Sequence, residues 1–229
     1  MTRTGSRGGR VFLLEIGTEE IPARMVDPAL ADLGRALHEA ITARHLAPDA
    51  GFTLKTNFES FGTPRRLAVR VHDLLARQPD TEVEVTGPPV KAAFDPSGRP
   101  TRAAEGFARA QGVDVAALRR LATPKGECVG VRRKVAGLDA SEVLAQAVPP
   151  IVAALTFPKM MRWGTGEHRF VRPIHSLVAL LDDLVVDMMI AGIRSGRETF
   201  GHRVLGQPRI SLSSPEAYSE ALRASHVLA

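Results

Sequence analysis

The sequence predicts an α+β fold, in which an antiparallel sheet with hairpins packs against separate helices. Two observations favour this class. Short apolar or alternating runs, typical of strands, are joined in pairs by turn residues, and amphipathic helical stretches stand apart from these pairs. With 229 residues, 44% of them apolar, the chain is long enough to bury one large core or two modest ones.

The first elements are predicted in the order strand, helix, strand, strand. Residues 11–17 form a short apolar run bounded by glycine, which predicts a buried strand. Asp27 followed by Pro28 is typical of a helix start and predicts a helix over about 28–45. Apolar residues then alternate over 52–58 and 67–71, on either side of the turn "FGTPRR", which predicts two half-buried strands.

Capping residues mark the elements of the middle region. A helix is predicted over 101–111, because Thr101 is a good N-cap and Gly112 is placed to end it. Asp114 is expected to begin a second short helix. A strand is expected over 129–135, where valines alternate with glycine and arginine.

The last part of the chain combines a long helix with a hairpin. Ser141 is expected to cap an amphipathic helix, and the proline pair at 149–150 should kink or break it, because neither ring nitrogen can donate a hydrogen bond. Apolar runs over 174–181 and 184–193 flank a tight acidic turn, which predicts a hairpin. A final helix is expected to begin at 214–215.

The composition limits the class of protein. A formal net charge of +5 favours contact with nucleic acid or an acidic surface, although many ordinary soluble domains carry as much. Cys128 is the only cysteine, which excludes an intrachain disulfide and suits the reducing cytoplasm. No apolar run approaches the ~18–20 residues of a membrane span, so no membrane partner is expected. Residues 1–10, basic and glycine-rich, are interpreted as a flexible tail.

No motif for a self-contained active site is present. "GTGEHR", at 164–169, lacks the third glycine of a dinucleotide fingerprint, and no P-loop, nucleophile elbow or zinc-protease motif occurs. The carboxylates at 15–20 could bind Mg²⁺, but stabilisation of a helix start is the favoured alternative. Three histidines lie near arginines rather than carboxylates in the sequence, which disfavours a metal site: His168, His175 and His202. We therefore assign no catalytic and no metal-binding residue.

Three cationic segments in predicted loops are candidate RNA contacts. The guanidinium group is a rigid donor fork that fits phosphate, and Trp163 could stack on an unpaired base. The alternative is that Trp163 and Phe170 fill the core while the arginines are merely solvated. The candidate RNA-binding residues are Arg65, Arg66, Lys159, Arg162, Trp163, Arg169, Arg172, His175, Arg194, Arg197, His202 and Arg203.

Six segments together resemble one known family. They are "LLEIGTEEIP", "GTPRRLAV", "GPPVKAAFDPSGRPTRAAEGFARAQGV", "FPKMMRWG", "RFVRPIHSLVALL" and "AGIRSGRETFGHR". In this order they resemble the β subunit of bacterial heterotetrameric glycyl-tRNA synthetase, from about Val11 to the end of the chain. The resemblance implies a cytoplasmic α2β2 ligase that joins glycine to tRNA(Gly) with ATP.

The resemblance also implies the partners and the domain organisation. The partners are the α subunit, which holds the catalytic core, tRNA(Gly) and a second β subunit. ATP and Mg²⁺ are expected at the α subunit, with no cofactor bound by this chain. Family members are much longer, and their HD-type and anticodon-binding domains are absent here. Residues 11–229 are therefore interpreted as the N-terminal α+β region of such a subunit, with a candidate sub-boundary near 75–90.

Alternative functions remain open at this point. The chain could be a structural module that docks the α subunit without touching RNA, or an inactive truncated product. A free-standing hydrolase or editing domain would need a pocket with perturbed titratable groups, and the sequence indicates none.

Overall fold

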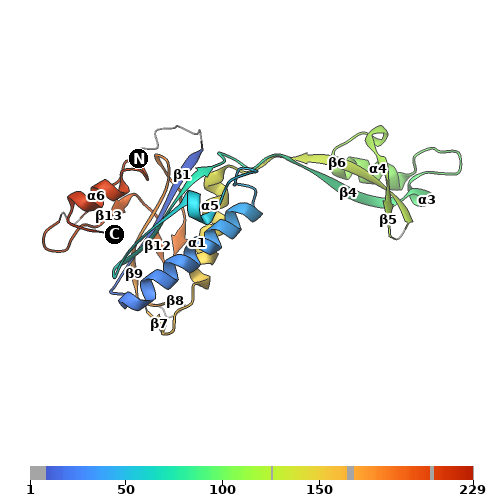
Figure 1. Ribbon diagram of the computed structural model, residues 1–229. Coiled ribbons are helices and arrows are strands. Elements are labelled where there is room, and N and C mark those ends of the chain that lie inside the picture. The colour runs from blue at the N-terminus through green and yellow to red at the C-terminus, as the bar shows by residue number, and fades with distance from the viewer. Residues whose placement is uncertain (1–8, 125, 164–167, 207–208, 229) are drawn as a thin grey trace. The chain divides into compact units, whose positions relative to one another are not determined.

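The computed structural model describes residues 9–124, 126–163, 168–206 and 209–228. The chain divides into two compact units, which Figure 1 shows with their elements labelled. Unit 1 is formed by residues 1–78 and 138–229, and unit 2 by residues 79–137. The first division falls inside the 75–90 range, and the return at 137–138 was not predicted. Residues 1–8 of the expected tail lie outside the described residues, and Arg10 already belongs to the first strand.

Two adjacent points of unit 1 mark where unit 2 is inserted. The backbone N–H of Gln78 donates to the carbonyl of Leu138 over 2.9 Å, and the N–H of Leu138 donates to Oε1 of Gln78 over 3.1 Å. Next to this pair, the N–H of Ala140 donates to the carbonyl of Ala76 over 2.9 Å. The chain therefore leaves unit 1 and returns to it at positions that hydrogen bonds hold together.

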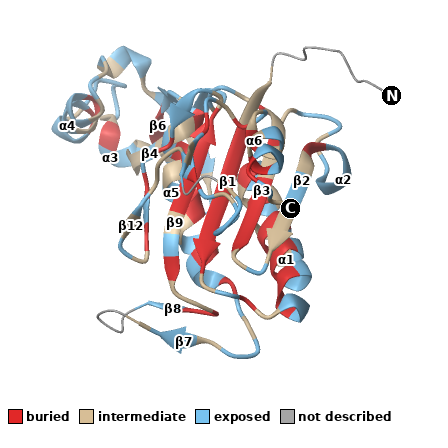
Figure 2. Ribbon diagram, turned by 90° about the vertical axis from the view of Figure 1, so that its left-hand side faces the viewer, coloured by how far each residue is buried: buried red, intermediate tan, exposed pale blue. Residues whose placement is uncertain are grey.

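Unit 1 is built on a five-stranded antiparallel sheet with the first strand at its centre. In spatial order the strands are β10 (Leu184–Val185), β9 (Ile174–Leu181), β1 (Arg10–Thr18), β3 (Arg66–Leu74) and β2 (Phe58–Thr63). Figure 2 shows that buried residues are concentrated along β1, β3 and β9. The core of the unit therefore lies on the inner strands of this sheet.

Both faces of the sheet are covered. Successive side chains of a strand point to opposite faces, so β1 contributes residues to two separate cores. Phe12, Leu14 and Ile16 of β1 face the main core, which they share with α1 (Val26–Ala43) and α5 (Ala140–Ala154). Leu13 faces the other way and shares a smaller core with α6 (Tyr218–Ala224). Glu15 is buried on this second face together with Thr199 and Tyr218.

Short elements complete unit 1. They are η1 (Ala23–Met25), α2 (Leu54–Asn57), the ribbon of β7 (Met161–Arg162) and β8 (Arg169–Phe170), the pair β11 (Met189–Ile190) and β12 (Ile193–Arg194), and the pair β13 (Glu198–Thr199) and β14 (Ile210–Ser211).

Unit 2 has a three-stranded antiparallel sheet and its own small core. The strands lie in the order β4 (Thr81–Pro89), β6 (Gly126–Val135) and β5 (Arg119–Thr123). The remaining elements are α3 (Val90–Ala93), α4 (Arg102–Gln111) and η2 (Val115–Ala117). Ala93, Ala104 and Val129 form the buried centre.

The α+β class is confirmed, together with most of the predicted elements. Thr101 caps α4 by accepting from the N–H of Ala103, and Gly112 ends the helix with a φ of 69°. The hairpin around Asp182 is also confirmed, but its second arm, β10, has two residues only. Chain that was predicted to extend this arm forms the separate pair of β11 and β12.

Three elements differ from the predictions. Residues 54–57 form a helical turn instead of a strand, because Thr53 accepts from the N–H of Thr56 and so caps a turn. The helix expected from Asp114 is one 3-10 turn, since β5 follows it and pairs with β6. Finally, the proline pair at 149–150 does not break α5, which continues as far as Ala154.

The start of α5 also differs from the prediction. Its N-cap is Asp139 rather than Ser141, and Asp139 forms a capping box with Glu142. Val148 and Val152 are buried on either side of the prolines, and this packing holds the helix together where the prolines lack donors.

Candidate nucleic-acid interface

The β7–β8 ribbon carries the largest group of predicted RNA-binding residues. Met161 is paired with Phe170, and Arg162 with Arg169. Phe170 is buried, and its ring meets Phe157 edge to face, with the two centroids 5.0 Å apart. This aromatic contact anchors the ribbon to the main core of unit 1.

Arg162 and Arg169 are opposite each other in the ribbon. Directly paired residues of an antiparallel ribbon point to the same face, so two guanidinium groups share one side. Both residues are exposed, and neither side chain has an ion pair or hydrogen bond with another described residue. Like charges directly opposite one another destabilise a strand pair. A bound anion would relieve this repulsion.

A pocket of about 450 Å³ lies beside the ribbon. Its described lining contains no acidic residue, and it is mostly apolar. The lining residues are Pro149, Pro150, Val152 and Ala153 of α5, Trp163, His168, Arg169, Phe170, Ile174, and Met189, Ile190 and Ala191. Trp163 is partly buried and packs against the main core, while Met189 is 61% exposed. Residues 164–167, with the glycines of "GTGEHR", lie outside the described residues.

A second cluster of predicted residues lies at one end of the sheet. The His175 ring nitrogen Nε2 is 3.0 Å from Oε1 of Glu19, and Arg65 Nη2 is 3.4 Å from Oε2 of Glu19. The hydrogen bond from His175, helped by Arg65, holds the pKa of Glu19 below its usual 4.5. Arg172 donates through Nε to the carbonyl of Glu20 over 2.9 Å. The interpretation that His175 has only arginines near it is therefore wrong, because β1 and β9 bring it next to Glu19.

Arg66 is the one predicted contact that lies inside the protein. Its exposed fraction is 6%, its Nη1 is 3.4 Å from Oε2 of Glu15, and its Nη2 donates to the carbonyl of Phe200 over 2.6 Å. A guanidinium held in this way has no surface for a phosphate. We therefore leave Arg66 out of the proposed RNA-contacting set.

Glu15 is the centre of a buried polar cluster that the sequence analysis missed. Thr199 Oγ1 donates to the Glu15 carboxyl over 2.7 and 2.8 Å, and the Tyr218 hydroxyl donates to Oε2 of Glu15. Burial, together with the nearby Glu15 carboxyl, raises the pKa of the Tyr218 phenol well above 10.0. The available signal was a lone glutamate within an apolar run, at 15 in the stretch 11–17.

The cationic segment after β12 is mostly engaged within the protein. Arg194 donates to both carboxylate oxygens of Asp187, over 2.7 and 2.8 Å, and its hydrogen bonds keep the pKa of Asp187 below its usual 3.8. Arg197 donates to the carbonyls of Asp183 and Leu212. The two remaining predicted contacts of this segment are His202 and Arg203.

His202 accepts hydrogen bonds through Nδ1 from the N–H groups of Val204 and Leu205, and so orders its own loop. Arg203 is exposed and has no ion pair or hydrogen bond within the described chain. Four predicted cations are thus exposed and without a partner among the described residues. They are Lys159, Arg162, Arg169 and Arg203, and the first three belong to the ribbon and the segment that leads into it.

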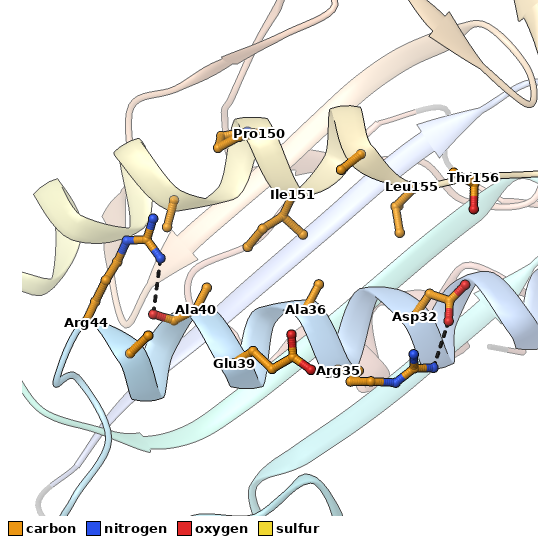
Figure 3. Close-up of a pocket in the computed structure, with 13 residues that line it drawn as sticks. Asp32, Arg35, Ala36, Glu39, Ala40, Arg44, Pro150, Ile151, Leu155 and Thr156 are labelled. Carbon is orange, nitrogen blue, oxygen red and sulfur yellow. Dashed lines mark hydrogen bonds and ion pairs between the residues drawn. The ribbon is translucent and has the colours of Figure 1, made fainter.

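A larger hollow, of about 660 Å³, lies between α1 and α5. Figure 3 shows small side chains such as Ala36 and Ala40 along it, with charged residues at its edge. Arg35 donates to Asp32 over 2.8 Å, and Arg44 donates to the Ala40 carbonyl over 3.4 Å. Its charged residues are thus partly satisfied within α1 itself.

The described residues contain no group of three or more His, Cys, Asp or Glu side chains that could hold a metal ion. None of the helices in the described chain is long and apolar enough to cross a membrane.

Comparison with known proteins identifies related chains. A family model described as "Glycyl-tRNA synthetase beta subunit" matches residues 12–229. A glycine–tRNA ligase beta subunit from Oleidesulfovibrio alaskensis is 45% identical over 213 residues, which cover 93% of this chain and 30% of that protein. The beta subunit from Geobacter metallireducens is 47% identical over 85% of this chain and 27% of its own length. The beta subunit from Citrobacter koseri is 41% identical over 93% of this chain and 30% of its own length. The chain thus spans about 30% of the length of these relatives.

Proposed function

The chain belongs to the glycyl-tRNA synthetase beta subunit family, and from that premise we propose that it contributes tRNA(Gly) binding and α-subunit assembly to an α2β2 glycine–tRNA ligase of the cytoplasm. In this proposal the α subunit performs the chemistry with ATP and Mg²⁺. The chain by itself, as the N-terminal part of a β subunit, does not charge tRNA.

The single observation that carries the RNA-binding part is the Arg162–Arg169 pair. Two arginines lie opposite each other on an exposed ribbon, without an acidic partner among the described residues. This arrangement costs stability in the free protein and is suited to a phosphate, which accepts hydrogen bonds from both guanidinium forks. Lys159, exposed just before the ribbon, adds to the same positive charge.

Salt-dependent binding tests this proposal. We expect the chain to bind tRNA(Gly) with an affinity that falls linearly with salt on a double logarithmic plot, because bound phosphates release counterions. The double variant Arg162→Ala/Arg169→Ala should bind more weakly and lower the slope by about 1.5–2. A control with the same net charge is Arg35→Ala/Arg132→Ala, whose arginines already pair with Asp32 and Glu84. Equal affinities of the two double variants would reject the assignment.

Aminoacylation assays test the division of labour. Glycyl-tRNA formation by purified α subunit is measured with this chain added and, as a control, with full-length β subunit added. The chain should support no more glycyl-tRNA formation than the full-length subunit does. Without α subunit, the chain should form none. Glycyl-tRNA produced by the chain in the absence of α subunit would overturn the proposal.

A second observation favours the docking of the α subunit. Val204 and Leu205 are 82% and 66% exposed, and Phe200 on the same segment is also exposed. Neighbouring exposed apolar side chains are typical of protein contacts. We expect Val204→Ser/Leu205→Ser to abolish co-purification with the α subunit, whereas Leu184→Ser, an exposed leucine on β10, should not. Retention of the α subunit by the double variant would exclude this segment as the contact.

A further inference from the structure

We propose that the pocket beside the β7–β8 ribbon receives one unstacked nucleobase of a bound RNA, while the adjoining phosphates lie at Arg162 and Arg169. This inference rests on the proposed RNA binding and adds a specific ligand to it. It assigns to the pocket a preference for single-stranded RNA over duplex RNA.

The walls of the pocket suit the flat face of a base. Trp163 provides an aromatic surface that packing against the main core holds in place. The rings of Pro149 and Pro150 and the flexible, exposed side chain of Met189 provide further apolar contact. Every base has a π-face, so stacking on an aromatic side chain does not require a particular sequence. The volume of about 450 Å³ lies in the usual range of roughly 300–1,000 Å³ for small-ligand pockets.

The charges around the pocket favour a nucleotide over an apolar peptide. Arg169 belongs both to the lining and to the arginine pair, so the apolar wall and the phosphate-binding groups are continuous. His168 is a further lining residue, exposed to solvent, that can donate to a phosphate or a base edge. A peptide matched to the apolar wall alone would leave the two guanidinium groups unpaired.

A base within a duplex cannot enter such a pocket, because both of its faces are stacked and its edge is paired. Proteins that recognise RNA by sequence or by single strands instead take bases that are splayed out of loops and ends. The pocket is therefore expected to select an unpaired nucleotide of the tRNA.

The chain offers a direct readout, because Trp163 is its only tryptophan. All tryptophan fluorescence therefore comes from a pocket residue. We expect a short single-stranded oligoribonucleotide to quench this fluorescence upon binding. The same sequence as a duplex, and heparin as a polyanion without bases, should bind in a salt-dependent manner without the same quenching.

Two alanines of α5 provide a matched pair of variants. Ala153 lines this pocket, whereas its exposed neighbour Ala154 lines the separate hollow between α1 and α5. Ala153→Leu should fill the pocket, remove the quenching and weaken single-strand binding by roughly 5- to 150-fold, the range expected for one lost base–aromatic stack. Ala154→Leu, with the same added volume, should leave both unchanged. Neither variant removes a charge.

The outcomes separate this inference from the proposed function. If single strand and duplex bind alike, without a change in Trp163 fluorescence, the pocket is not a base site, although RNA binding stands. Equal effects of Ala153→Leu and Ala154→Leu would also overturn the inference. If none of the three polyanions binds, both the pocket assignment and the proposed function fail.

Discussion

Glu15 and Tyr218 show how single residues fix the C-terminal part of unit 1. The carboxyl of Glu15, 1% exposed, joins β1 to Tyr218 of α6 and to Thr199 of β13, and Arg66 supplies the positive charge. Each of these groups is costly to bury alone, and the hydrogen bonds to the Glu15 carboxyl offset much of this cost. The cluster therefore holds the last elements against the sheet.

Replacement of Tyr218 should reveal this role. Tyr218→Phe keeps the ring and removes the hydroxyl that donates to Glu15. We expect it to lower the free energy of unfolding by about 1–3 kcal/mol at neutral pH, because a buried acceptor loses a partner. Chemical denaturation measures the change. A loss no larger than that caused by Phe61→Leu, next to the Tyr218 ring, would contradict the role of the hydroxyl.

The raised pKa of Tyr218 predicts a loss of stability at alkaline pH. The phenol ionises near 10.0 in the unfolded chain and well above it in the folded protein. The unfolded state therefore loses its proton first as the pH rises. Between the two pKa values stability should fall by about 1.4 kcal/mol per pH unit from this group. Because Tyr218 is the only tyrosine, tyrosinate absorbance should appear only with unfolding, and Tyr218→Phe should lack this part of the pH dependence.

The pair of Glu19 and His175 gives a prediction at acid pH. Hydrogen bonding to His175 lowers the pKa of Glu19, so the stabilising contact is present above 4.5 and is lost as the pH falls through the folded pKa. We expect His175→Gln to move the pKa of Glu19 up toward 4.5. NMR titration of the side-chain carboxyl carbon measures it. An unmoved pKa would mean that Arg65 alone lowers it.

At the scale of elements, the proposed RNA contact predicts that a change which stabilises the β7–β8 ribbon weakens binding. Arg162→Glu places a negative charge opposite Arg169 and turns a repulsive pair into an attractive one. The ribbon should then gain about 0.2–1 kcal/mol, seen as slower amide exchange at the paired residues, while tRNA affinity falls. Arg162→Gln, which removes the charge only, should lie between the wild type and Arg162→Glu in both measurements. Faster exchange in Arg162→Glu would disprove the repulsion.

Elements were predicted correctly where signals within the element itself agreed. They were predicted poorly where contacts with residues distant in the sequence determine the local structure. The cap and the glycine of α4 act within one turn, so Thr101 and Gly112 were sufficient. In contrast, β5 forms only because β6 lies beside it, and α5 survives its proline pair because Val148 and Val152 are buried against the sheet. Neither tertiary contact can be seen in a window of sequence.

The candidate site shows the same limit. Arg162 and Arg169 were named from their charge, but their pairing depends on the register of the ribbon. Arg66 was included with Arg65 because the two are adjacent, yet Arg66 begins β3 and its side chain lies in the core. Successive residues at a strand start point to opposite faces, so two adjacent arginines can have different surroundings. Which of the two is buried depends on where the strand begins and on what packs against it.

At the scale of the whole molecule, the insertion of unit 2 into unit 1 predicts a viable deletion. The N–H of Gln78 already donates to the carbonyl of Leu138 across the junction, and the N–H of Leu138 donates to the Gln78 side chain. We expect a chain in which a two-glycine turn replaces residues 79–137 to fold with an intact five-stranded sheet. Circular dichroism and a shielded Tyr218 phenol would show this fold. Retained tRNA affinity would place the RNA contacts in unit 1, and exposure of Tyr218 at pH 10 would show that unit 1 requires unit 2.

The central place of β1 has a consequence for biosynthesis. This strand leaves the ribosome before both of its neighbours, and one of them, β9, is translated only after the whole inserted unit. At about 5–20 residues per second, on the order of ten seconds pass before that edge of β1 is covered. We therefore expect the nascent chain to complete its inner unit before its outer one, and to need protection by a chaperone during the interval.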